Sequence, residues 1–95
     1  MEPNQATAAP DQRRRRLTLR ATHMGTKEND VLLGGYVAAH IAQLTEAELD
    51  SLEDILTIPD PVLADWLTGR AAIPDDVTNP LLRKIRASIE KGVLF

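Results

Sequence analysis

Three helix-start signals follow one another in this chain from Thr45 onward. Thr45 and Glu48 have the spacing of a capping box, in which the threonine hydroxyl caps the helix and the glutamate caps the threonine in return. Asp60 and Asn79 each stand directly before a proline, and a proline fits the first turn of a helix because its missing N–H is not needed there. The spacing of these signals leaves room only for short helices and predicts an all-α fold.

Apolar side chains recur at helical spacing throughout the chain. We expect five helices, over about 12–22, 26–44, 45–58, 60–69 and 79–92. No segment alternates apolar and polar residues as a half-buried strand would, so no strand is expected. The predicted buried stripes are Leu17, Ala21 and Met24; Leu32, Leu33, Tyr36, Val37, His40, Ile41 and Leu44; Leu49, Leu52, Ile55 and Leu56; Leu63, Trp66 and Leu67; and Leu82, Ile85 and Ile89. These stripes predict one small five-helix bundle.

The length of 95 residues allows a single domain with one core. We expect a disordered tail over 1–11, because prolines and small residues stand there without periodicity, a folded domain over 12–92, and a short tail over 93–95. No apolar run approaches the roughly 20 residues that cross a membrane. The chain has no cysteine, and its polar first residues lack the apolar segment of a secretory signal. These features predict a bacterial cytoplasmic protein.

The sequence offers little for catalysis or for holding a metal ion. His23 and His40 lie far apart, without a cysteine beside them, whereas a metal site needs several ligands at close spacing. His40 falls on an apolar stripe and is expected to be a hydrogen-bonded core histidine. Gly34 and Gly35 lie within a helical pattern and lack the lysine and hydroxyl residue of a phosphate-binding loop, so they favour close helix packing instead. We therefore expect no enzyme and no tightly bound cofactor.

A run of four arginines, 13–16, could meet phosphates. It is the main support for an alternative reading as a small helical nucleic-acid-binding protein, and an antitoxin-like regulator is a further alternative. Against nucleic acid, the net charge is −3 and no aromatic side chain stands near the run to stack on bases. Because four consecutive residues surround a helix, at least one of these arginines must lie against the protein or against a partner.

The segment after the first helix is the strongest candidate for function. Gly25 breaks the helix, and Glu28 and Asp30 follow at once in the first turn of the next helix. Two carboxylates at a helix start can simply cap that helix, because its dipole favours negative charge there. The alternative is an exposed surface that binds the arginine or backbone groups of a partner.

Two segments carry a resemblance to a known family. The segment 20–36, RATHMGTKENDVLLGGY, resembles the signature of the SdhE family of bacterial succinate dehydrogenase assembly factors, whose hallmark is Arg-Gly-x-x-Glu followed by an acid. Gly25, Glu28 and Asp30 match that hallmark. The segment 52–69, LEDILTIPDPVLADWLTG, resembles the family's Asp-Pro-x-Leu-x-x-Trp-Leu helix. The chain departs from the signature at Met24, which stands where the family has an arginine.

The resemblance implies a five-helix protein that promotes covalent attachment of FAD to a partner. The implied partner is the flavoprotein subunit of succinate dehydrogenase, or the related fumarate reductase flavoprotein, whose own histidine attacks FAD. The factor itself would be a monomer when free and would not hold FAD tightly. The implied partner-binding residues surround the helix break, and they are Arg20, His23, Met24, Gly25, Lys27, Glu28 and Asp30.

Overall fold

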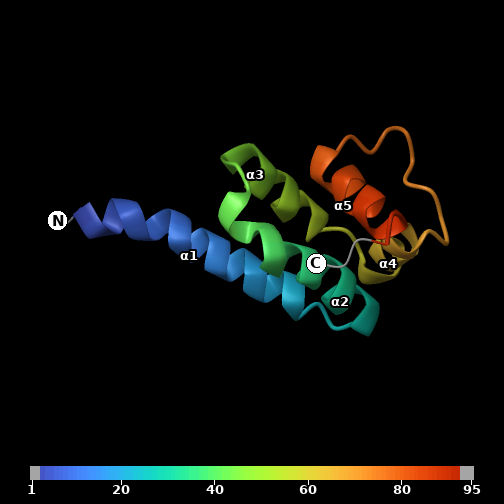
Figure 1. Cartoon of the computed structure of the whole chain (residues 1–95), viewed down its shortest axis with the longest axis horizontal. Helices are drawn as coiled ribbons and strands as arrows, with labels where there is room; N and C mark the ends of the chain where they lie inside the picture. The colour runs from blue at the N-terminus through green and yellow to red at the C-terminus, as the bar shows by residue number, and fades with distance from the viewer. Residues whose placement is uncertain (1–2, 93–95) are drawn as a thin grey trace.

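The computed structural model describes residues 3–92, with side chains from residue 11 onward, and contains five α-helices and one short 3-10 helix in that range. Helix α1 (Pro3–Thr22) lies along one side of the molecule, and its N-terminal half projects beyond the other helices (Figure 1). Helix α2 (Lys27–His40) runs back beside it. The all-α prediction is confirmed, because no strand occurs in the described range.

Helix α1 begins earlier than the sequence analysis expects. Its helical backbone starts at Pro3 instead of Gln12, so it runs through most of the segment expected to be a disordered tail. Pro3 suits a first helical position, and the alanines that follow are good helix formers. The predicted tail over 93–95 lies outside the described residues.

Helix α2 is shorter than predicted, because its last turn tightens into a 3-10 helix, η1 (Ile41–Gln43). Gly34 lies where α2 meets α1. A Cβ at this position would come within 2.9 Å of the Ala21 carbonyl oxygen and 3.0 Å of the Thr22 Cα. Since these are backbone atoms, only a glycine permits this approach, and the expected role of Gly34 in close helix packing is confirmed.

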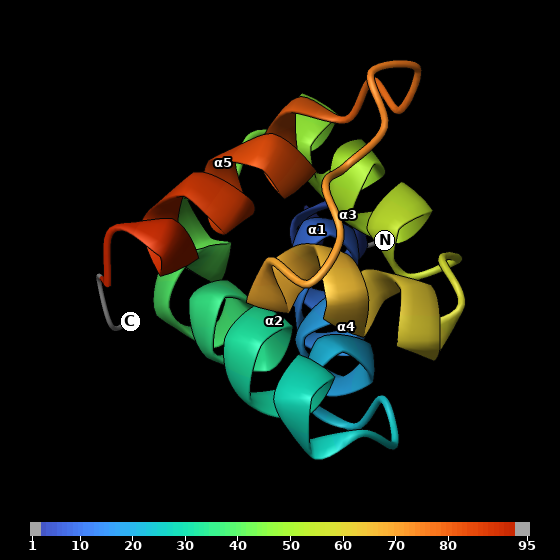
Figure 2. The same ribbon diagram turned by 90° about the vertical axis from the view of Figure 1, so that its right-hand side faces the viewer.

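The remaining helices are α3 (Glu46–Ile55), α4 (Asp60–Thr68) and α5 (Pro80–Glu90). Both hydrogen bonds of the predicted capping box of α3 are present, and the Asn79 side chain caps α5 by accepting from the Leu82 N–H. The predicted cap at Asp60 is wrong: Asp60 is already helical, and Pro59 precedes it without a side-chain cap. Seen from the end of the bundle, α4 lies between α2 and α5 (Figure 2).

The core is almost entirely aliphatic, as the composition predicts. Trp66 is only half-buried and packs at the edge of this core, whereas Leu81, which the stripes omit, is buried. His40 is half-buried, and its Nδ1 lies 2.9 Å from the Tyr36 carbonyl oxygen, as expected of a hydrogen-bonded histidine. The buried cluster comprises Leu17, Ala21, Leu33, Tyr36, Val37, Leu44, Leu49, Leu52, Ile55, Leu63, Leu67, Leu81, Leu82 and Ile85.

Candidate functional site

The chain between α1 and α2 forms a tight turn that hydrogen bonds hold in place. Gly25 adopts a φ of +101°, a backbone conformation that residues with a side chain rarely take. Thr26 then caps α2, its hydroxyl oxygen accepting from the Asn29 N–H at 3.4 Å. The Met24 N–H donates to Asp30 Oδ1 at 2.6 Å. Asp30 is half-buried, and this hydrogen bond closes the turn.

Glu28 is the exposed carboxylate of this turn. One of its oxygens, Oε2, lies 3.3 Å from Nη1 of Arg70, which follows the end of α4. The Nε of Arg70 also donates to Asp65 Oδ1 at 3.0 Å. The hydrogen bond to Asp65, and after it the one to Glu28, raises the pKa of Arg70, and its guanidinium stays charged. One oxygen of Glu28 is thus held by Arg70, and the other makes no hydrogen bond to the described residues.

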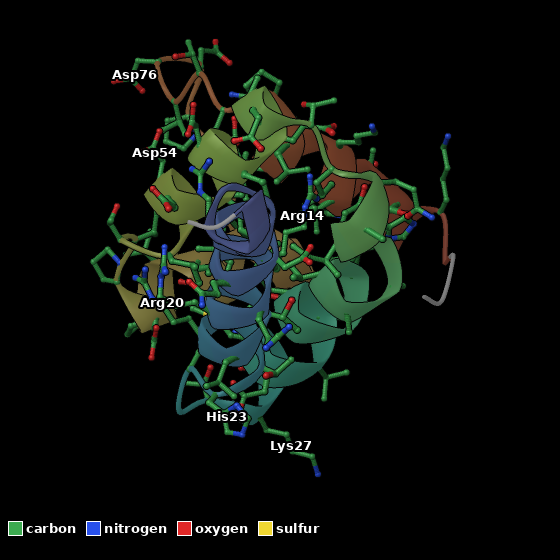
Figure 3. All side chains as sticks on the ribbon, turned by 90° about the vertical axis from the view of Figure 1, so that its left-hand side faces the viewer. Arg14, Arg20, His23, Lys27, Asp54 and Asp76 are labelled. Atoms are coloured by element: carbon green, nitrogen blue, oxygen red, sulfur yellow. The ribbon has the colours of Figure 1, made fainter. Side chains whose placement is uncertain are left out.

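A hollow of about 200 Å³ lies on one side of the turn. It is lined by three of the predicted site residues, Arg20, His23 and Met24, together with Leu56 and Asp60. Arg20 and His23 are exposed, whereas Met24 is half-buried and packs against the core. In Figure 3, His23 and Lys27 lie at the end of the molecule where α1 turns into α2.

A buried amide lies behind this surface. Asn29 is fully buried, and its Nδ2 donates to the Asp60 carbonyl oxygen at 3.1 Å. Its Oδ1 has no hydrogen-bond partner in the part of the chain that the structure describes. Because the bond joins the first turns of α2 and α4, it fixes Asp60 relative to Glu28. The structure therefore brings together two parts of the chain that lie far apart in sequence.

The arginine run divides into two structural and two exposed residues. Arg13 donates to three carboxylates of α3: Glu46 at 2.9 Å, Asp50 at 2.6 Å and Glu53 at 3.2 Å. Arg14 donates to the backbone carbonyl of Ile41. Arg15 and Arg16 are exposed. The expectation that part of this run lies against the protein is confirmed.

Sequence reasoning missed three residues around the turn: Arg70, Asp60 as a lining residue, and Asn29. An asparagine on an otherwise apolar helical stripe could have drawn attention to Asn29. No local sequence pattern marks Arg70, because its pairing with Glu28 depends on how α4 packs against α2.

Among the described residues, no group of three or more histidine, cysteine or acidic side chains could hold a metal ion. The turn thus offers charged and polar contacts for a partner.

Comparison with known proteins gives these contacts a family context. A family model described as the flavinator of succinate dehydrogenase matches residues 15–89. The chain belongs to this family. It is 49% identical over 73 residues to the FAD assembly factor SdhE of Acetobacter pasteurianus, a match that covers 77% of this chain and 67% of that protein. The family predicted from the motifs in 20–36 and 52–69 is thereby confirmed.

More distant relatives come from bacteria and from mitochondria. The FAD assembly factor SdhE of Haemophilus ducreyi is 32% identical over 66 residues, covering 70% of this chain and 80% of that protein. The mitochondrial succinate dehydrogenase assembly factor 2 of Dictyostelium discoideum is 30% identical over 73 residues, covering 77% of this chain and 52% of that protein. This chain therefore spans about half the length of the mitochondrial relative. No solved structure matches the chain.

Membership in this family makes the chain an assembly factor and not an enzyme, as the sequence analysis expects. Within the described range, every helix is too short or too polar to pass through a lipid bilayer. That Arg20, His23, Met24, Gly25, Lys27, Glu28 and Asp30 bind a partner remains a prediction.

Proposed function

We propose that this chain binds the flavoprotein subunit of succinate dehydrogenase in the bacterial cytoplasm and promotes covalent attachment of FAD to it. Membership in the flavinator family carries this proposal. The related fumarate reductase flavoprotein is a second partner of the same kind. In this proposal the free factor is a monomer, and it holds no FAD tightly, since the sequence carries no flavin-binding motif.

The mechanism that we propose is selection of a conformation of the partner. If the factor binds one conformation of the flavoprotein more tightly than another, it increases the population of that conformation. If that conformation aligns the flavoprotein's histidine with FAD, the reaction gains from preorganisation without a catalytic group on the factor. Glu28 is the residue best placed to contact the flavoprotein, since its carboxylate is 51% exposed and Arg70 orients it.

The alternative of nucleic-acid binding is less favoured. Arg13 is neutralised by three carboxylates, and the guanidinium of Arg14 is bound to a backbone carbonyl. Two of the four arginines that suggested phosphate contacts are therefore occupied within the protein. No observation favours an antitoxin.

The deciding experiment compares Glu28→Ala with a matched control, Lys84→Ala. Lys84 pairs with Glu48 at the same distance, 3.3 Å, as Glu28 with Arg70. Glu28→Ala should cost only about 0.3–1 kcal/mol of folding stability, because a first-turn carboxylate interacts weakly with the helix dipole. It should weaken binding to the flavoprotein by about 2–5 kcal/mol, as truncating a charged group in a buried interface does.

The readout is covalent flavin fluorescence of the flavoprotein on a denaturing gel, in a host that lacks its own factor. We expect flavinylation with the parent chain and with Lys84→Ala, and a marked loss with Glu28→Ala. If the parent chain neither supports flavinylation nor co-purifies with the flavoprotein, the proposed function is wrong. If Glu28→Ala is as active as the parent chain, the function stands but this turn is not the contact surface.

A further inference from the structure

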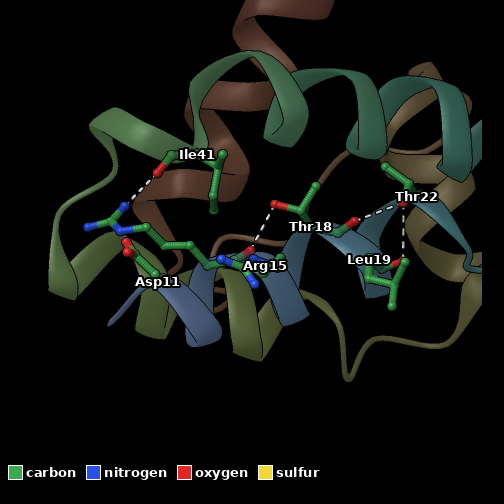
Figure 4. A pocket seen from close by; sticks show the side chains of 7 residues that line it. Asp11, Arg15, Thr18, Leu19, Thr22 and Ile41 are labelled. Atoms are coloured by element: carbon green, nitrogen blue, oxygen red, sulfur yellow. Dashed lines mark hydrogen bonds between the residues drawn. The ribbon is translucent and has the colours of Figure 1, made fainter. Parts of the chain in front are cut away.

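A second hollow, which we call the α1 groove, runs along the side of α1 that faces η1 (Figure 4). Its volume is about 430 Å³, and one stripe of α1 forms its floor: Arg15, Thr18, Leu19 and Thr22. Ile41 of η1 forms the opposite wall. Arg14, at one end of this groove, and Arg20, in the hollow beside the turn, lie on opposite sides of α1 (Figure 3). The α1 groove is therefore separate from the candidate site.

Apart from its two arginines, the α1 groove offers mainly apolar surface. Leu19 is 61% exposed, whereas Leu17, on the same helix, is completely buried. The hydroxyls of Thr18 and Thr22 donate back to carbonyl oxygens of their own helix, at 2.8 Å and 2.9 Å. A ligand in the groove would therefore meet mainly the side chains of Leu19 and Ile41. Single exposed leucines are common, but this one lies in a groove that can accept another side chain.

The rim of the α1 groove carries uncompensated positive charge. Arg14 is fixed at one end by its hydrogen bond to the Ile41 carbonyl. Arg15 is exposed, and no carboxylate pairs with it among the described side chains. Asp11 contributes one acid to the lining, against these two cations. Arg13, by contrast, pairs with three carboxylates of the protein. Only part of the arginine run is therefore paired within the folded chain.

We propose that the α1 groove binds a segment of the flavoprotein that carries an apolar side chain beside a carboxylate. The apolar side chain would cover Leu19 and Ile41, and the carboxylate would pair with Arg15. A protein segment fits better than nucleic acid, because the groove lining is apolar and has no aromatic ring for stacking. This inference rests on the proposed function. It adds a second contact to the one at the turn, so that the flavoprotein would contact the C-terminal half of α1 on two opposite sides.

The test measures the affinity of purified flavoprotein subunit for Leu19→Ser and Arg15→Glu. Two controls match these changes: Val62→Ser removes another exposed apolar side chain, on α4, and Arg16→Glu makes the same charge change one residue along α1. Losing the apolar contact should weaken binding about tenfold in Leu19→Ser. Arg15→Glu should weaken it at least as much, and both controls should stay within about twofold of the parent chain.

A photo-crosslinking residue in place of Leu19 gives a second measurement that does not depend on affinity. It should capture the flavoprotein, whereas the same residue in place of Val62 should not. If the parent chain does not bind flavoprotein at all, the proposed function fails, and this inference fails with it. If the parent chain binds but Leu19→Ser and Arg15→Glu match their controls, only the groove proposal is overturned. Crosslinking to a second copy of the chain, or to RNA, would also overturn it.

Discussion

Gly25 shapes the candidate site through its backbone alone. With φ at +101°, it turns the chain between α1 and α2 and leaves the Met24 N–H facing the Asp30 carboxylate. A Cβ at Gly25 would meet only Asp60 Oδ2, at 3.9 Å, so a side chain there has room. The cost of any other residue is therefore backbone strain and not a steric clash.

Gly25→Ala should lower the free energy of unfolding by roughly 1–2 kcal/mol, the cost of placing an L-residue in the left-handed region. Gly92→Ala is its control, because Gly92 also has a positive φ, +74°, with nothing within 4 Å of a Cβ. Urea unfolding should show similar losses for both variants. Only Gly25→Ala should also weaken binding to the flavoprotein. Equal binding by both would show that the geometry of the turn is unimportant.

At the scale of elements, the fold depends on how closely α1 and α2 approach at Gly34. Gly34→Ala should destabilise the protein by about 1–3 kcal/mol, because its methyl group would press against the backbone of α1 and force the helices apart. This loss should exceed the roughly 1 kcal/mol that alanine gains over glycine within a helix. The measurement is the urea midpoint with the m-value unchanged. A higher midpoint would mean that the two helices separate at little cost.

The capping box of α3 should make stability depend on pH. The hydrogen bond from the Thr45 backbone N–H, followed by the contact with Lys84, lowers the pKa of Glu48 below its usual value. A carboxyl whose pKa is lowered by folding stabilises the protein above its unfolded pKa of about 4.3, and this stability is lost as pH falls through the folded value. Glu48→Gln keeps a capping side chain that does not titrate.

Urea midpoints measured from pH 7 down to pH 3 test this prediction. The parent chain should lose more stability than Glu48→Gln over the acid part of this range. Because other carboxylates also titrate there, the difference between the two proteins is the informative quantity. Parallel curves for both would mean that Glu48 does not contribute to the acid dependence.

At the scale of the whole molecule, Arg13 holds the long helix α1 against α3 through three carboxylates. Its hydrogen bonds to Asp50 and Glu53 raise the pKa of Arg13, so the clamp is charged at any pH where the carboxylates are ionised. Without this guanidinium, Glu46, Asp50 and Glu53 would repel one another along α3. This contact ties the part of α1 around Arg13 to α3, in addition to the packing of α1 against α2.

Arg13→Ala should lower the urea midpoint at low ionic strength. The difference from the parent chain should shrink at about 1 M salt, where the screening length falls to about 3 Å. Arg16→Ala is the control, since Arg16 is exposed and pairs with no carboxylate among the described side chains. If the two variants unfold alike at low salt, the clamp contributes nothing measurable.

The sequence by itself determined the helical class, most of the helix starts and the aliphatic core. The reason is that these features depend on local physics: a cap residue and its partner lie within one turn, and a helical stripe repeats every three or four residues. The capping box at Thr45 and the cap at Asn79 appear in the structure as the sequence predicts. The family motif located the turn, because Gly25, Glu28 and Asp30 lie within six consecutive residues of the chain.

Only the tertiary structure decided which groups meet across the molecule. Arg70 lies 42 positions from Glu28 and Arg13 lies 33 positions from Glu46, so no local pattern could pair them. The same holds for Asn29 and Asp60, which join two helices that only packing brings together. Asp30 shows that even a local position can be ambiguous. Its place in the sequence is compatible with an exposed carboxylate and with one that closes the turn. The sequence shows which side chains are charged, but the packing of the helices decides which of them pair.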